Sequence, residues 1–70
     1  MAEGLTNRLR ELRGERDLTQ AALAERVGVS RKTINTVENG VFVPSAVLAL
    51  KLARALGVSV ETVFSLDRED

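Results

Sequence analysis

The sequence predicts a small all-α domain of five helices, and three observations support this. Short segments with helical spacing of apolar residues follow one another along the 70 residues. Most of these segments begin after a serine or threonine that can cap a helix, and several end at a glycine. The strand-favouring run at 41–43 has no evident partner and is closed by Pro44, so we expect a loop there, with Phe42 turned inward. One domain is expected over residues 1–70.

The first two helices are predicted from their apolar spacing and their boundaries. Leu5, Leu9 and Leu12 recur at intervals of four and three residues, so the first helix is expected to include all three. Thr19 can cap the second helix through its hydroxyl group. Gly28 ends it, because glycine adopts the left-handed conformation of a helix stop without steric cost. The residues expected to be buried on this helix are Leu23, Ala24 and Val27.

The third helix follows after a very short connection. Ser30 can cap it, Ile34 and Val37 form its apolar stripe, and Asn39 with Gly40 ends it. So short a turn around Gly28 forces a sharp crossing angle between the second and third helices. The sequence therefore predicts a helix-turn-helix over about 19–39.

The fourth and fifth helices make up the rest of the chain. Ser45 can cap the fourth helix, which is apolar over most of its circumference and is expected to be the central, most buried helix. Gly57 ends it, and Ser59 can cap a short fifth helix. The apolar residues of this fifth helix are Val60, Val63 and Phe64.

Composition argues against several classes of function. The chain has no cysteine and no histidine, so it lacks the usual metal ligands and the commonest general base, and no carboxylates are clustered. We therefore expect no enzyme activity, no cofactor and no metal site. No apolar run approaches the length of a membrane span, and the N-terminus has no apolar signal segment. Ten basic residues balance ten acidic ones, so any contact with nucleic acid has to be local.

The third helix carries a row of polar side chains opposite Ile34 and Val37. These side chains are Arg31, Lys32, Thr33, Asn35 and Thr36. A polar helix face is usually a solvated face and nothing more. The same row would also suit the edges of DNA bases, because Arg or Lys matches guanine, Asn can pair with adenine and the Thr methyl can contact thymine. Both interpretations remain open from the residues alone.

The run LRELRGERDLTQAALAERVGVSRKTINTVENG, continued by PSAVLALKLARALGVSVETVF, resembles the lambda-repressor-like helix-turn-helix family. This family includes the Cro/cI-type phage repressors and the xenobiotic-response-element regulators. The resemblance extends over residues from about 5 to 65. It implies a compact five-helix fold and binding of double-stranded DNA, with the third helix in the major groove. The outward row on that helix would then read bases, although this chain has Arg31 and Lys32 where many members have glutamine.

The resemblance also implies roles for polar residues beside that helix. Gln20 would lie near the DNA backbone and brace the third helix, and Asn39 would contact the backbone. Thr19 and Ser30 would either bond a phosphate or only cap their helices. Arg13 and Glu38 would form a partly buried ion pair that holds the third helix against the first. The alternative for this pair is two exposed, weakly interacting side chains.

The resemblance further implies a homodimer that reads a palindromic operator. The fifth helix and the tail, about 59–70, are the expected interface, with Val63, Phe64 and Leu66 as contacts. The alternative for Val63 and Phe64 is closure of the monomer core. The expected protein is a cytoplasmic, prokaryotic or phage-derived repressor or autoregulator, found on the nucleoid when bound. Nothing indicates a small-molecule effector or a membrane partner. A protein-interaction adaptor, or an antitoxin-like partner protein on the same scaffold, is the alternative.

Overall fold

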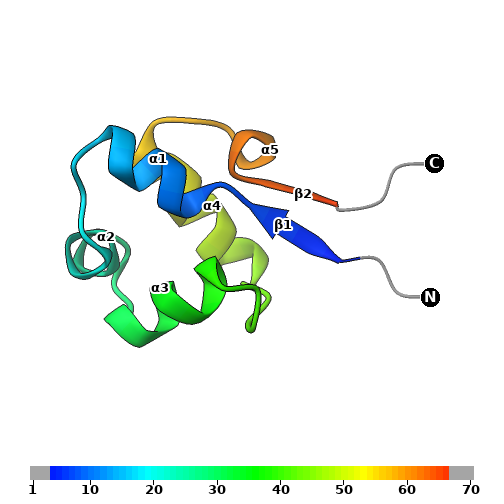
Figure 1. The fold of residues 1–70 in the computed structure, drawn as a ribbon, viewed down its shortest axis with the longest axis horizontal. Coiled ribbons are helices and arrows are strands. Elements are labelled where there is room, and N and C mark those ends of the chain that lie inside the picture. The colour runs from blue at the N-terminus through cyan, green and yellow to red at the C-terminus, as the bar shows by residue number, and fades with distance from the viewer. Residues whose placement is uncertain (1–3, 67–70) are drawn as a thin grey trace.

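A computed structural model describes residues 4–66 of the chain. Five helices and two short strands follow one another along it, and Figure 1 shows the strands side by side beyond the helical body. The elements in chain order are β1 (Leu5–Asn7), α1 (Leu9–Glu15), α2 (Gln20–Val27), α3 (Arg31–Glu38), α4 (Ala46–Leu56), α5 (Val60–Val63) and β2 (Phe64–Leu66). The prediction of a mostly helical, five-helix domain is confirmed.

The helix boundaries follow from side-chain caps that the sequence supplies. The hydroxyl groups of Thr19, Ser30, Ser45 and Ser59 each accept a hydrogen bond from a backbone N–H in the first turn of α2, α3, α4 and α5 respectively. At the other end, Gly28 stops α2 with φ at 77°. This left-handed conformation lets the N–H groups of Gly28 and Val29 bond back to the carbonyl of Ala24.

One core joins all five helices. Its fully buried members include Leu9, Leu23, Ile34 and Leu52, each at 0% exposure. These four come from α1, α2, α3 and α4 in turn, so every one of these helices contributes at least one buried side chain. The core is completed by Leu12, Ala24, Val27, Val37, Leu48, Ala53, Leu56, Val63 and Phe64.

The strand pair corrects the predicted start of the first helix. Leu5 lies in β1, which pairs antiparallel with β2 through Leu5 opposite Leu66 and Asn7 opposite Phe64. Helix α1 begins only at Leu9. The spacing of Leu5, Leu9 and Leu12 fits a helix. The backbone groups of β1 form their hydrogen bonds with β2 instead, about 59 residues further along the chain. Such a long-range pairing leaves no local signal in the sequence.

A further expectation was wrong, because Phe42 does not turn inward but is 46% exposed. The other side of helix α4 carries Val47 and Leu50, which are 63% and 61% exposed. The same helix still contributes four side chains to the core, namely Leu48, Leu52, Ala53 and Leu56. The domain is too small to surround α4, so one apolar stripe remains on the surface.

Within residues 4–66, no helix is long and apolar enough to cross a bilayer, and no group of side chains is suited to hold a metal ion.

Candidate nucleic-acid interface

The connection between α2 and α3 holds the two helices at a fixed angle. Only three residues, 28–30, separate them. Gly28 supplies the left-handed turn, and Ser30 caps α3 through the N–H of Thr33 at 3.1 Å. Ala24 on α2 is 3% exposed, and α2 and α3 contact each other closely. This connection is the predicted helix-turn-helix, and it leaves the outer face of α3 exposed.

Helix α3 has one apolar and one polar face. Ile34 and Val37 point into the core, at 0% and 2% exposure. Arg31, Lys32 and Asn35 are exposed on the other side. Thr33 and Thr36 are half-buried at its margin.

Arg31 and Lys32 keep their charged groups available. Within residues 4–66 neither side chain takes part in an ion pair or hydrogen bond. They lie in the first turn of α3, beside its N-terminal N–H groups. Because no acidic residue lies in that turn, positive potential accumulates there.

The hydroxyl residues of the predicted site already have partners inside the protein. Thr19 accepts from the N–H of Ala22 at 3.0 Å, so it caps α2. The hydroxyl groups of Ser30 and Thr33 are 3.0 Å apart, and Thr36 donates to the carbonyl of Thr33 at 2.9 Å. What these threonines offer outward is therefore mainly the methyl group, which suits contact with a thymine methyl.

A polar network connects α1, α2 and α3 around one carboxylate, and we call it the Glu38 network. The Glu38 side chain exposes 0% of its surface. Arg13 donates to both of its oxygens, from Nε to Oε2 at 2.6 Å and from Nη2 to Oε1 at 3.1 Å. Gln20 Nε2 donates to Glu38 Oε1 at 3.1 Å. The structure thus brings Arg13, Glu38 and Gln20 together as the resemblance implied, and it also places Arg10 Nε 3.8 Å from Glu38 Oε1.

The same network extends to the outer face of α3. Gln20 Nε2 also donates to Asn35 Oδ1 at 3.2 Å. Asn39 Nδ2 donates to the Asn35 backbone carbonyl at 2.9 Å and to Asn35 Oδ1 at 3.2 Å. Arg10 Nη2 in turn donates to Asn39 Oδ1 at 3.4 Å. Asn35 is therefore held from two sides, although its own position is exposed.

Two opposing effects set the ionisation of Glu38. Burial by itself raises the pKa of a carboxyl group, because it penalises the charged form. Hydrogen bonds from Arg13 and Gln20, together with the charges of Arg13 and Arg10, outweigh this and leave the pKa of Glu38 below its ordinary value. The hydrogen bond to Glu38 likewise raises the pKa of Arg13. The pair is thus fully charged at neutral pH.

The structure corrects part of the predicted dimer interface. Val63 and Phe64 are 1% and 7% exposed and belong to the core of the protomer. Val63 ends α5 and Phe64 begins β2, and both side chains pack against the core, so they are not available to a partner. Leu66 is 54% exposed and keeps its predicted availability. The rest of the predicted tail, 67–70, lies outside the described residues.

Two residues of this region were not singled out from the sequence. Asn7 donates from Nδ2 to the carbonyl of Val37 at 3.0 Å, and its Oδ1 accepts from the N–H of Leu9 at 3.0 Å. It joins the end of α3 to the start of α1. Arg10 is the second, as part of the Glu38 network. Its position three residues before Arg13, on one side of α1, is the only signal that the sequence offered.

Comparisons with known proteins agree with this geometry. A family model described as helix-turn-helix matches residues 9–63. A protein of Methanothermobacter thermautotrophicus named an HTH-type transcriptional regulator is 52% identical over 62 residues, which cover 87% of this chain and 90% of the relative.

Solved structures give the same picture. The restriction-modification controller protein C.AhdI from Aeromonas hydrophila superposes with a TM-score of 0.75 at 42% identity, covering 79% of this chain and 83% of that one. The P22 c2 repressor, solved in complex with a synthetic operator, gives 0.74 at 35% identity over 77% and 82% of the two chains.

Proposed function

Because this chain belongs to the Cro/cI-type helix-turn-helix family, we propose that it is a DNA-binding transcription regulator that reads double-stranded DNA through α3. The observation that carries this proposal is the pair of exposed cations, Arg31 and Lys32, on a helix whose opposite face is locked into the core. Relatives named as transcriptional regulators and the operator-bound P22 c2 repressor support the same assignment.

The polar residues on the outer face of α3 have three kinds of proposed role. Arg31 and Lys32 supply charge for guanine edges or phosphates, and Thr33 and Thr36 offer their methyl groups. Asn35 lies between them and contacts a base edge. Residues that cap a helix or belong to the Glu38 network approach the DNA backbone in this proposal, where backbone N–H groups at the start of α2 can face a phosphate. These residues are Thr19, Gln20, Ser30 and Asn39.

In finer detail, the proposed protein is a homodimeric repressor or autoregulator that occupies a palindromic operator in the cytoplasm of a prokaryote. A single module of this size contacts few base pairs, and a two-fold dimer places two copies of α3 about 34–36 Å apart on successive major grooves. Occupancy of the operator then excludes or recruits polymerase.

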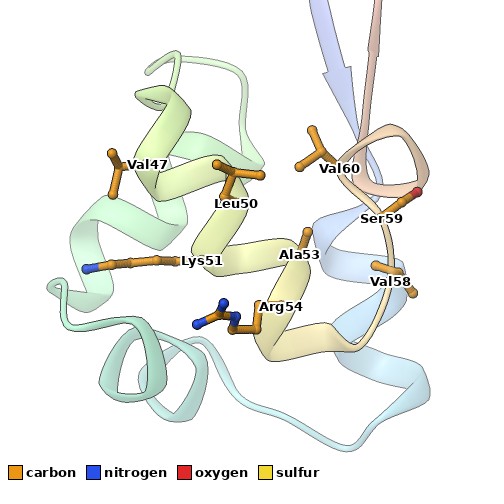
Figure 2. A pocket seen from close by; sticks show the side chains of 8 residues that line it. All are labelled: Val47, Leu50, Lys51, Ala53, Arg54, Val58, Ser59 and Val60. Carbon is orange, nitrogen blue, oxygen red and sulfur yellow. The ribbon is translucent and has the colours of Figure 1, made fainter.

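We place the dimer contact on the exposed side of α4. Figure 2 shows Val47 and Leu50 on α4 and Val60 at the start of α5 along a groove, with Lys51 and Arg54 at its edge. An apolar centre with a polar rim is the usual anatomy of a protein interface. The proposed occupant is a second copy, because a palindrome requires one, and α3 stays free for DNA.

The proposed function is tested by selecting binding sites from random duplex DNA at low salt. Wild-type protein is expected to enrich a palindrome, and a variant with Arg31→Ala and Lys32→Ala is expected to lose or relax it. A matched control is Arg8→Ala with Arg26→Ala, which removes two exposed cations that lie neither on α3 nor in the groove of α4, and it should leave the selected site unchanged. Enrichment of nothing by the wild type would reject the proposal and favour the protein-interaction adaptor.

The dimer is tested separately by sedimentation equilibrium. Leu50→Asp is expected to convert a dimer into a folded monomer, because it places a charge at the centre of the groove. Glu25→Ala changes an exposed residue of α2 and serves as the control. A wild-type monomer at all concentrations would contradict the dimer without affecting DNA recognition by a single module.

A further inference from the structure

The hydrogen bonds of the Glu38 network have a fixed direction, and that direction determines what Asn35 offers to DNA. A carboxylate only accepts hydrogen bonds. Gln20 must therefore present its Nε2 group to Glu38, and the second proton of that group points to Asn35 Oδ1 at 3.2 Å. The orientation of the Gln20 amide is thus set by the buried charge of Glu38.

Asn39 leads to the same result from the other side. Its Nδ2 lies 2.9 Å from the Asn35 backbone carbonyl, which also only accepts. Its Oδ1 accepts from Arg10, which only donates. The Asn39 amide is therefore fixed at both ends, and its remaining proton points to Asn35 Oδ1 at 3.2 Å.

Asn35 Oδ1 consequently receives two hydrogen bonds, one from Gln20 and one from Asn39. A carbonyl oxygen has two lone pairs, so its accepting capacity is used inside the protein. The Asn35 Nδ2 group makes no hydrogen bond within residues 4–66, and the residue is exposed. The side chain therefore presents only donors to the outside.

We propose that Asn35 is a donor-only reader of the major groove, which selects a base edge that accepts hydrogen bonds. The bidentate pairing of asparagine with adenine needs Oδ1 to accept from the adenine amino group. Here that oxygen is occupied, so adenine loses its usual advantage. Adenine N7 can still accept, but the neighbouring adenine amino group is a donor and opposes the second Nδ2 proton. Guanine N7 and O6 are two neighbouring acceptors, and thymine O4 is an acceptor as well, so both bases match Nδ2 better. Gln20 and Asn39 are positioning residues, because their hydrogen bonds to Asn35 Oδ1 orient the Asn35 amide toward the base. This proposal rests on the proposed DNA-binding function.

The first test needs no DNA. In the free protein, side-chain amide NMR should show the Gln20 and Asn39 NH2 protons protected from exchange with water and the Asn35 NH2 protons exchanging freely. Protected Asn35 Nδ2 protons would show the opposite orientation and overturn the proposal, whatever the protein binds.

The second test compares binding-site selections by the wild type and by Asn35→Ala. The position at which preference relaxes is the one that Asn35 reads. We expect guanine or thymine at that position in the wild-type site, and about tenfold weaker binding of that site by the variant. Adenine at that position, or no position that relaxes, would overturn the proposal. Since the wild type would still enrich a site in either case, this failure differs from failure of the proposed function.

The third test addresses the positioning role of Gln20. Gln20→Met keeps the length of the side chain but removes one of the two donors to Asn35 Oδ1, so only the hydrogen bond from Asn39 still orients the asparagine amide. The preference at the Asn35 position is then expected to broaden to include adenine, while the positions read by Arg31 and Lys32 keep theirs. An unchanged preference at the Asn35 position would show that the network does not set the orientation. Circular dichroism checks that the variant is folded.

Discussion

Two arginine–glutamate pairs lie at opposite ends of α1, and they combine the same side chains in different surroundings. At the first end, Arg8 Nε lies 3.0 Å from Glu11 Oε1, with both side chains at least half exposed. At the other end, Arg13 meets Glu38 at 2.6 Å, with exposures of 14% and 0%. Both glutamates have a pKa below the ordinary value. At Glu11 the main cause is the hydrogen bond from Arg8. At Glu38 burial acts to raise the pKa, and the hydrogen bonds and nearby charges outweigh it.

The difference lies in what each pair does for the fold. The Arg8–Glu11 pair joins residues three apart at the start of α1, and both side chains are exposed, so either residue can be solvated alone. The buried side chain of Glu38 lies on α3 and has partners from α1 and α2, so loss of a partner leaves an uncompensated charge. The same kind of ion pair therefore contributes little to the fold at Arg8–Glu11 but connects three helices at Arg13–Glu38.

Removal of the buried carboxylate is the change with the largest expected effect. Glu38→Ala leaves the Arg13 guanidinium without its partner in a mostly buried position, which typically costs about 3–5 kcal/mol of unfolding free energy. Because a domain of this size has about 4–10 kcal/mol in total, much of its stability would be lost. Urea denaturation measures this loss. A loss below about 1 kcal/mol would place the pair in the same class as the exposed one.

Acidification should produce a smaller effect with a defined sign. The pKa of Glu38 is lowered in the folded protein, so its contribution to stability is present above the ordinary carboxyl pKa and is lost as pH falls through the folded-state value. The difference in unfolding free energy between the wild type and Glu38→Gln should therefore shrink between neutral pH and about pH 3. A difference that stays constant with pH would mean that charge at Glu38 contributes nothing. Glu11→Gln is the matched control at the exposed pair.

The smallest effect is expected at the exposed pair itself. Glu11→Ala removes the partner of Arg8, and water takes its place. We expect no resolvable shift of the urea midpoint at neutral pH and moderate salt. A shift comparable to that of Glu38→Ala would show that burial does not separate the two pairs.

The helices were predictable from the sequence because their signals are local. The caps at Ser45 and Ser59 and the stop at Gly57 act within one turn of the chain, so their spacing could be read directly. The resemblance to the helix-turn-helix family also indicated the Arg13–Glu38 contact. Neither source indicated Asn7 or Arg10, whose partners lie about 30 residues away.

Burial was less predictable than helix position. Phe64 continues the apolar side of α5 in the sequence, and nothing local distinguishes a side chain that closes the core from one that meets a partner. The outcome depended on β1, which pairs with β2 and holds Phe64 against the helices. Val47 and Leu50 are equally apolar but are exposed, because no element within residues 4–66 packs over that side of α4.

The sequence by itself determined where α2, α3 and α4 begin and end, where α5 begins, and which polar side chains line α3. Capping and apolar periodicity act over a few residues and depend little on distant parts of the chain. Only the tertiary structure decided that Glu38 is buried among three helices and that Asn35 turns its donors outward. Both depend on side chains from α1, α2 and α3 meeting at one point, and hydrogen-bond direction there is fixed by a charge that no local pattern reveals.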